Sequence, residues 1–336
     1  MFIIDSYLKI VFFAASLAVF AVLSRKKSEY GVCLAAFFLP FYIFKFNLFG
    51  LPLNFFEVLV YFLFLIWLSR GGFEKMIKLF SEIKENRTFT AGLILFFVGV
   101  LISTFLSDDL RTSAGILKGW FIAPFLLFLI IKAEIKTENQ IKNIFAALVA
   151  SGAAVAAVSL VYYFSGRLTF DGRLAAFYLS PNHLAMFLAP ISVLAAGLVF
   201  LSQNRREKIF FGAASVLIAA AVYLTYSYGA CAALFSAAAV FFLLGHFASK
   251  LKFLPFLALT AVILILFSFQ NGGERFQNLF SERSSFASRV MIWKSAFLIL
   301  KDNWFFGIGP GTFQRIILDT KNISRPIWNG PFPSRI

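Results

Sequence analysis

The sequence predicts an all-α protein, a polytopic transmembrane helical bundle of about ten spans followed by an external, partly helical C-terminal segment. Of the 336 residues, 60% are hydrophobic and only 14% are charged, whereas soluble chains carry about 25% charged residues. The apolar residues come in runs of about 18–20 that short polar stretches interrupt, which is the pattern of helices that cross a bilayer. Open sheets are excluded in lipid because every backbone polar group must be paired internally.

Ten apolar runs are interpreted as spans, and together they make residues 1–270 a transmembrane bundle. In chain order they are 7–24, 31–49, 53–69, 90–106, 119–131, 143–164, 183–201, 209–226, 229–247 and 253–270. The fifth run is short, and an earlier start is the alternative for it. The first run is not a cleaved signal peptide, because its positive charges, Arg25 to Lys27, follow the apolar stretch instead of preceding it.

The connectors between these runs predict the orientation. One alternating set carries 16 Lys and Arg residues and the other carries four. Because positive charge marks the cytoplasmic side, the N-terminus and the C-terminal segment 271–336 are predicted to lie outside. In a soluble protein, a net charge of +15 would suggest that the partner is a nucleic acid. Here the positive charges are explained by the orientation of the chain in the membrane, and no nucleic-acid partner is expected.

Residues 73–83 predict an amphipathic helix at the membrane interface, since their large apolar side chains repeat with helical spacing. A plain solvated linker is the alternative. Beyond residue 270 the chain becomes polar and aromatic. Its basic residues are compatible with the predicted orientation because long external segments cross regardless of charge, and they suggest anion binding. They are Arg275, Arg283, Arg289, Lys294, Lys301, Arg315, Lys321, Arg325 and Arg335.

The predicted spans offer little chemistry at the membrane midplane. No ionisable side chain lies in the middle of a span between residues 90 and 270, whereas ion-coupled transporters place such groups inside their spans. No Cys/His cluster has zinc spacing, and Cys33 and Cys231 are predicted near opposite faces. No metal and no cofactor are expected, and chemistry is predicted at the outer surface.

The external loop 165–182 is the first candidate site. It contains Arg167, Asp171 and Arg173 and closes with Ser180, Pro181 and Asn182 before a span. An Asn before a helix can cap its free N–H groups, and a helix N-terminus beside an arginine suits an anion. Two alternatives stay open for Arg173, pairing with Asp171 or with a lipid headgroup. His183 comes next, and a lone histidine there is usually hydrogen-bonded to backbone or water.

Two further external stretches accompany this loop. In "YLTYSYGACAA", residues 223–233, Gly229 permits a tight turn between spans, and Tyr226 and Tyr228 suit interfacial anchors. In residues 284–313, a serine at 284, 285 or 288 could cap a helix that runs to about Asn303. Arg289 would lie in its first turn. "GIGPGTF", with Gly309 and Gly311, ends this helix.

The order of these motifs resembles a known family. An external "R…F…PNHLA" loop, a "T-x-S-x-G-A" turn and an "R-x-x-x-W…GIGPGTF" element come one after another over residues 90–313. This arrangement is similar to the O-antigen ligase and O-antigen polymerase superfamily of bacterial membrane glycosyltransferases. The resemblance implies transfer of a glycan from an undecaprenyl-diphosphate carrier to a hydroxyl of lipid A-core or of another glycan. The setting would be the periplasmic face of the inner membrane, in lipopolysaccharide or surface polysaccharide assembly.

The resemblance also implies site residues. Arg173 and Arg289 match the arginines that hold the diphosphate, and Pro181, Asn182, Gly309 and Gly311 would form the supporting turns. The family has "SRG" where this chain has "SYG", so Tyr228 replaces an arginine whose contact Arg167 could supply. The family's catalytic histidine lies in an "HN" element that would fall beyond Ile336. The resemblance therefore implies a truncated member, inactive by itself, and assigns no catalytic residue within this chain.

Three alternatives remain open from the sequence. A ligase and a polymerase cannot be separated by these motifs. A transporter or flippase for an anionic lipid or glycan would need a polar midplane path, which the sequence lacks. A non-catalytic membrane scaffold would account for the missing histidine element.

Overall fold

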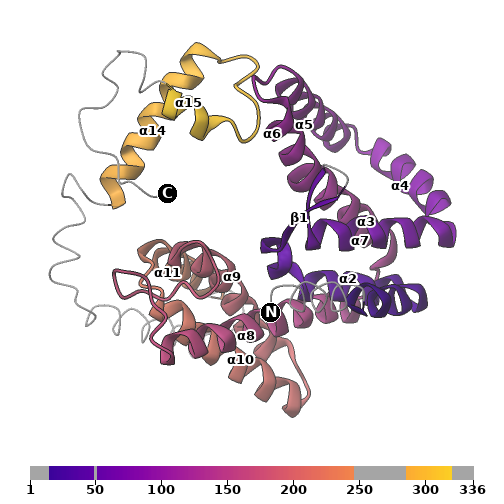
Figure 1. The fold of residues 1–336 in the computed structure, drawn as a ribbon. Helices are drawn as coiled ribbons and strands as arrows, with labels where there is room; N and C mark the ends of the chain where they lie inside the picture. The colour runs from indigo at the N-terminus through magenta and orange to yellow at the C-terminus, as the bar shows by residue number, and fades with distance from the viewer. Residues whose placement is uncertain (1–14, 49–50, 246–284, 320–336) are drawn as a thin grey trace, which may run out of the picture. The chain divides into compact units, whose positions relative to one another are not determined.

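A computed structural model describes residues 15–48, 51–245 and 285–319 of the chain (Figure 1). The fold is of the all-α membrane type. Six helical stretches in the described residues are long and apolar enough to cross a membrane: Phe55–Glu85, Arg87–Phe105, Leu110–Glu134, Glu138–Phe164, Pro181–Leu201 and Arg205–Leu224. The count of about ten spans stays a prediction, and the span 253–270 and the predicted domain boundary at residue 270 lie outside the described residues.

The described chain divides into two compact units. The first contains residues 15–48, 51–71 and 130–245, and the second contains residues 72–129 and 285–319. The break near residue 71 has a local cause, because Arg70 and Gly71 leave the helical region and Gly71 has a φ of +79°, a conformation that favours glycine.

In the first unit the predicted span 31–49 is interrupted. Helix α2 (Ser28–Phe37) gives way to the 3-10 helix η1 (Leu39–Ile43), and strands β1 (Lys45–Leu48) and β2 (Leu51–Asn54) form an antiparallel hairpin. Pro40 explains the interruption, since proline has no N–H to donate and its ring clashes with the preceding helical turn. Helix α3 (Phe55–Trp67) then begins, with the Asn54 side chain as its cap at 2.9 Å from the Glu57 amide nitrogen.

Helices α8 (Glu138–Phe164), α9 (Pro181–Leu201), α10 (Arg205–Leu224) and α11 (Tyr228–Gly245) complete the first unit. Their positions agree with the spans predicted at 143–164, 183–201, 209–226 and 229–247. Helices α8, α9 and α10 pack on one another around an apolar core rich in alanine and leucine. Small residues let such helices approach closely: a Cβ on Gly152 of α8 would lie 2.7 Å from Ile191 Cγ2 and 3.2 Å from Ile218 Cδ1.

The second unit contains helix α4 (Phe73–Glu85), which confirms the amphipathic helix predicted for 73–83. Its Leu79 and Ile83 are buried with Leu129, whereas Phe73 and Ile77 are exposed. The apolar face is therefore divided between the protein and its surroundings. The location of α4 at the membrane interface stays a prediction.

Helices α5 (Arg87–Phe105), α6 (Leu110–Ile116) and α7 (Ala123–Glu134) come next, with the π-helical segment η3 (Leu117–Ile122) between α6 and α7. The unit boundary falls within α7, after Leu129. The fifth span was predicted at 119–131, but the helical stretch begins at Leu110. Most of the predicted connector 107–118 is therefore helical, because Asp109 caps α6. The unit is completed by α14 (Ser285–Asp302) and α15 (Phe313–Asp319).

Candidate functional site

The loop between α8 and α9 is folded by its own backbone. Helix α8 ends in a Schellman motif, in which the Gly166 amide donates to the Tyr163 carbonyl and the Arg167 amide to the Tyr162 carbonyl. Gly166 takes the positive φ, +69°, that this motif needs. A second turn is closed by the Thr169 hydroxyl, which lies 2.9 Å from the Arg173 carbonyl oxygen and 3.0 Å from its amide nitrogen. The loop thus presents Arg173 in a defined orientation.

The Arg173 side chain joins the loop to the ends of two helices. Its Nε donates to the Thr225 carbonyl oxygen at 2.8 Å, at the end of α10, and its Nη2 donates to Asn182 Oδ1 at 3.0 Å, in the first turn of α9. Nη1 lies 3.8 Å from Asp171 Oδ2, and only 18% of the side chain is exposed. The pairing with Asp171 that the sequence left open is therefore present, together with two stronger contacts. The planar guanidinium is held at several points.

The supporting turn differs from the prediction in its cap. Ser180, rather than Asn182, is the N-cap of α9, with its hydroxyl oxygen accepting from the His183 amide. Pro181 occupies the first helical position, where its missing N–H costs nothing, and the Asn182 side chain is released to contact Arg173. His183 is exposed, with its ring Nδ1 3.3 Å from the Ser180 hydroxyl.

Arg167 lies on the same loop but has a different environment. Its side chain is exposed, and its guanidinium carbon lies 5.8 Å from the centre of the Tyr162 ring, within cation–π range. Three large apolar side chains of the loop and its flanks are also strongly exposed: Phe164, Phe170 and Leu179. Arg167 is thus the more accessible cation of this loop.

The turn between α10 and α11 also differs from the prediction. Tyr226, with a φ of +48°, is the left-handed residue, whereas Gly229 already lies in the first turn of α11. The Ser227 hydroxyl oxygen lies 3.5 Å from the Ala230 amide nitrogen near the start of that helix. Tyr228, at the position where the resemblance expects an arginine, begins α11 and is partly exposed.

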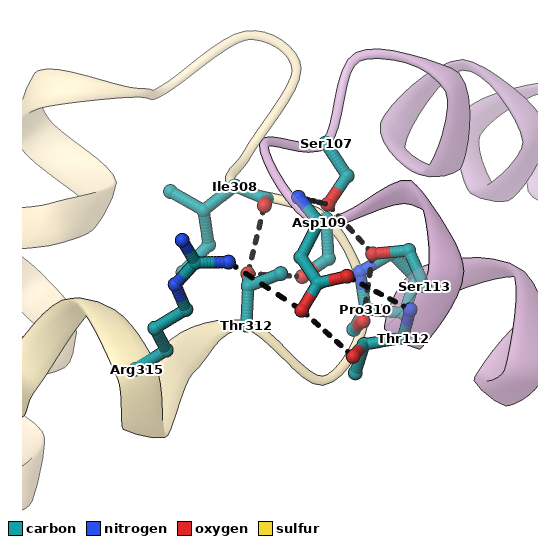
Figure 2. A network of polar contacts seen from close by, with 9 residues as sticks. Ser107, Asp109, Thr112, Ser113, Ile308, Pro310, Thr312 and Arg315 are labelled. Atoms are coloured by element: carbon teal, nitrogen blue, oxygen red, sulfur yellow. Dashed lines mark hydrogen bonds and ion pairs between the residues drawn. The ribbon is translucent and has the colours of Figure 1, made fainter.

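In the second unit, the glycine-rich stretch lies against the corner between α5 and α6 (Figure 2). Asp109 caps α6, with Oδ1 3.1 Å from the Thr112 amide nitrogen and Oδ2 2.8 Å from the Thr112 hydroxyl. Arg315, from α15, places Nη1 3.5 Å from Asp109 Oδ2. The hydrogen bonds from Thr112, with Arg315 as a smaller contribution, lower the pKa of Asp109.

The two glycines that were predicted to form a supporting turn, Gly309 and Gly311, pack closely against side chains of this corner. Gly309 has a φ of +89°, and a Cβ on it would lie 2.3 Å from Ser107 Oγ. Gly311 has a φ of +83°, and its Cβ would lie 3.0 Å from Ile116 Cγ1 and 3.1 Å from Thr112 Cγ2. Both glycines are therefore needed for packing of this stretch, by backbone conformation and by space.

Arg289 is exposed on α14. The helix begins at Ser285, so Arg289 comes after its first turn instead of lying in it. Large apolar side chains of this helix are also exposed, and Trp293 and Phe297 are each more than half accessible. Arg167 and Arg173 belong to the first unit and Arg289 to the second, so their union in one site stays a prediction.

Sequence reasoning missed the partnership of Asp109 with Arg315. The capping role of Asp109 could have been found from "SDDLRT", in which an aspartate precedes a helical stretch. The ion pair could not, because the two residues are 206 positions apart.

The comparison with known families bears on the second half of the chain. Residues 213–331 match the family model described as O-antigen ligase. This part of the chain is therefore similar to the O-antigen ligase family. The match confirms the predicted resemblance, and it contains Tyr228, Arg289, Gly309 and Arg315 but not the loop between α8 and α9.

This similarity supports a glycan-transfer role in polysaccharide assembly and a membrane location. It also agrees with the apolar helices of the fold. No curated protein and no solved structure matches the chain.

Proposed function

We propose that this protein transfers a glycan from an undecaprenyl-diphosphate carrier to an acceptor hydroxyl at the periplasmic face of a bacterial inner membrane. The observation that carries the proposal is the O-antigen ligase match over residues 213–331. The acceptor is lipid A-core in a ligase and another glycan in a polymerase. The description of the matched family favours the ligase.

The chemistry is a displacement at the anomeric carbon of the carrier-linked sugar. The acceptor oxygen forms a bond to that carbon, the bond from carbon to phosphate oxygen breaks, and the diphosphate leaves with the electron pair. The acceptor proton passes to a base, which the family provides as a histidine of its large external loop. Negative charge therefore grows on the diphosphate, and a cation held beside it lowers the barrier.

Arg173 is the first residue that we assign to this task. A guanidinium binds phosphate oxygens through a planar fork, and fixing it in advance removes part of the entropy cost of binding. The contacts to Thr225 and Asn182 provide such fixation. The start of α9, a helix of 21 residues, adds a positive dipole end on the side of Asn182.

Arg167 and Arg289 complete the proposed set. Both are exposed, so they are available to a phosphate group or a lipid-linked glycan. Arg167, above Tyr162, would take the place of the arginine that Tyr228 replaces. Arg289 comes from the part of the chain that the family match includes.

The experiment is complementation of a strain that lacks the complete gene. Loss of a ligase leaves carrier-linked polymer unattached, whereas loss of a polymerase leaves single repeat units on the acceptor. We expect Arg173→Ala and Arg289→Ala each to lower transfer by about 10²–10³, the usual cost of removing one transition-state donor. Arg205→Ala, at the exposed start of α10 on the predicted cytoplasmic side, is the matched control and should complement fully.

Arg173→Ala also removes the contacts to Thr225 and Asn182, so its protein level is measured and Arg173→Lys is tested beside it. Lysine keeps the charge but loses the planar fork, and intermediate transfer is expected. Normal transfer by both alanine variants would disprove the diphosphate assignment. Normal assembly of all surface glycans in the deletion strain would disprove the function itself.

A further inference from the structure

The corner between α5 and α6 is shaped to receive the stretch between α14 and α15. We call residues 308–312 the docking turn. The turn contacts the corner through a steric fit and a buried hydroxyl, and Arg315, on α15 just beyond the turn, adds an ion pair (Figure 2). These contacts join residues about 200 positions apart within the second unit.

The steric fit is specific to one glycine. A Cβ on Gly309 would lie 2.3 Å from Ser107 Oγ, 2.4 Å from Ser107 Cβ and 2.9 Å from Ser113 Oγ. Gly307 also has a positive φ, +68°, but a Cβ there would meet only Ser103 Oγ at 3.6 Å, an ordinary contact. The two glycines therefore share a backbone requirement and differ in the space that the corner leaves them.

The hydroxyls of the corner form a chain that ends on the docking turn. Ser113 is fully buried, with its Oγ 2.6 Å from Ser107 Oγ and 3.0 Å from the Pro310 carbonyl oxygen. Ser107 Oγ in turn accepts from the Asp109 amide at 3.2 Å. One hydroxyl carries one proton, so both contacts are satisfied when Ser107 donates to Ser113 and Ser113 donates to Pro310. If the docking turn moved away from the corner, these buried hydroxyl groups would lose the carbonyl oxygen that accepts their last hydrogen bond.

The ion pair fixes the start of α15, directly after the turn. Asp109 is held by Thr112 as the cap of α6, and its Oδ2 faces Arg315 Nη1 at 3.5 Å. The Thr312 hydroxyl closes the turn on itself, since its oxygen lies 2.7 Å from the Ile308 carbonyl oxygen and 2.8 Å from that of Gly309, and its one proton is shared between them. The chain between Arg289 and Arg315 is therefore anchored close to its C-terminal end.

We propose that Ser107, Asp109 and Ser113 are positioning residues for the transfer reaction, because they seat the docking turn and so fix the chain that carries Arg289 and Arg315. This role rests on the proposed function, since it concerns where Arg289 is held during transfer. None of the three residues touches the reacting atoms. They act through the docking turn.

The seating is tested first without reference to activity. Amide hydrogen exchange is measured over residues 307–316 in the protein expressed from its complete gene and placed in lipid nanodiscs. Gly309→Ala should speed exchange in this segment by about tenfold or more, since a buried hydrogen bond and the close fit are lost together. Gly307→Ala, at a glycine whose φ is also positive (+68°, against +89° at Gly309), should change exchange much less.

A compensating variant separates the fit from general damage. Ser107→Gly removes the two atoms nearest the added Cβ, so Ser107→Gly/Gly309→Ala should exchange more slowly than Gly309→Ala alone. Equal exchange rates in Gly309→Ala and Gly307→Ala, or no difference between the double variant and Gly309→Ala, would overturn the seating.

The positioning role is tested by transfer kinetics in the same preparation. Asp109→Asn keeps a capping oxygen but loses the charge that faces Arg315. We expect its kcat to fall about tenfold while the KM for the acceptor stays unchanged, because a displaced cation stabilises the transition state less and leaves acceptor binding alone. Faster exchange in Gly309→Ala together with unchanged kcat in Asp109→Asn and Ser113→Ala would overturn the positioning role. Normal transfer in Arg173→Ala and Arg289→Ala would instead contradict the proposed diphosphate site and leave the exchange result standing.

Discussion

The Asp109 carboxylate serves two helices, because it caps α6 and faces Arg315 at the start of α15. Its contact with Thr112 is local and is expected from the pattern of an aspartate before a helix. Its contact with Arg315 depends on the tertiary fold, because the two residues are 206 positions apart. No local sequence pattern predicts such a contact. Similarly, "SPNH" contains enough information to place Ser180 at the N-cap of α9, whereas the role of Asn182 as a partner of Arg173 depends on the fold of the preceding loop.

The pKa of Asp109 gives a prediction at this scale. The folded protein lowers that pKa, so the charged form contributes stability above the unfolded value of about 3.9, and this contribution is lost as the pH falls through the lowered folded value. Exchange over residues 307–316, corrected for intrinsic rates, should therefore stay constant from neutral pH down to about 5 and rise only below about 4. Asp109→Asn should remove the acid step. An acid step that persists in Asp109→Asn would assign it to another group.

At the scale of elements, long helices bounded by polar residues were predicted more reliably than interruptions within an apolar run. Helices α8 to α11 and α14 agree with prediction because long apolar runs end at polar connectors. The predicted span 31–49 is interrupted at Pro40. The fifth span takes the earlier start that the sequence left open, and the capping pattern at Asp109 could have located that start at Leu110. The approach of α8 to α9 and α10 could not be predicted from "ASGAA" alone, since small residues permit close packing without naming a partner.

Gly152 tests this packing. Gly152→Ala would force Ile191 and Ile218 to move, since its Cβ would lie 2.7 Å and 3.2 Å from them, and overpacking of this kind costs about 1–3 kcal/mol. Gly212→Ala, on α10, is the matched control, because a Cβ there meets nothing within 4 Å. Thermal unfolding of the purified protein should show a lower midpoint for Gly152→Ala and an equal or higher one for Gly212→Ala. Equal midpoints in the two variants would mean that α8 does not pack on Ile191 as described.

At the scale of the whole molecule, composition was sufficient for the all-α membrane class, since a chain with so few charges and such long apolar runs has few other folds. Composition did not determine the number of spans, because kinks and short helices interrupt several of the runs. The orientation rests on the unequal distribution of Lys and Arg between alternating connectors and stays a prediction. The proposed function rests on the family match over residues 213–331, which contains the last two of the three motifs.

The most direct measurement of the central claim is transfer by the purified protein, expressed from its complete gene, in liposomes that contain a glycan on undecaprenyl diphosphate and a lipid acceptor. We predict that glycan appears on the acceptor while an equal amount of free undecaprenyl diphosphate is released. Movement of the intact carrier across the bilayer, with the glycan still attached and the acceptor unmodified, would contradict the account and favour a transporter.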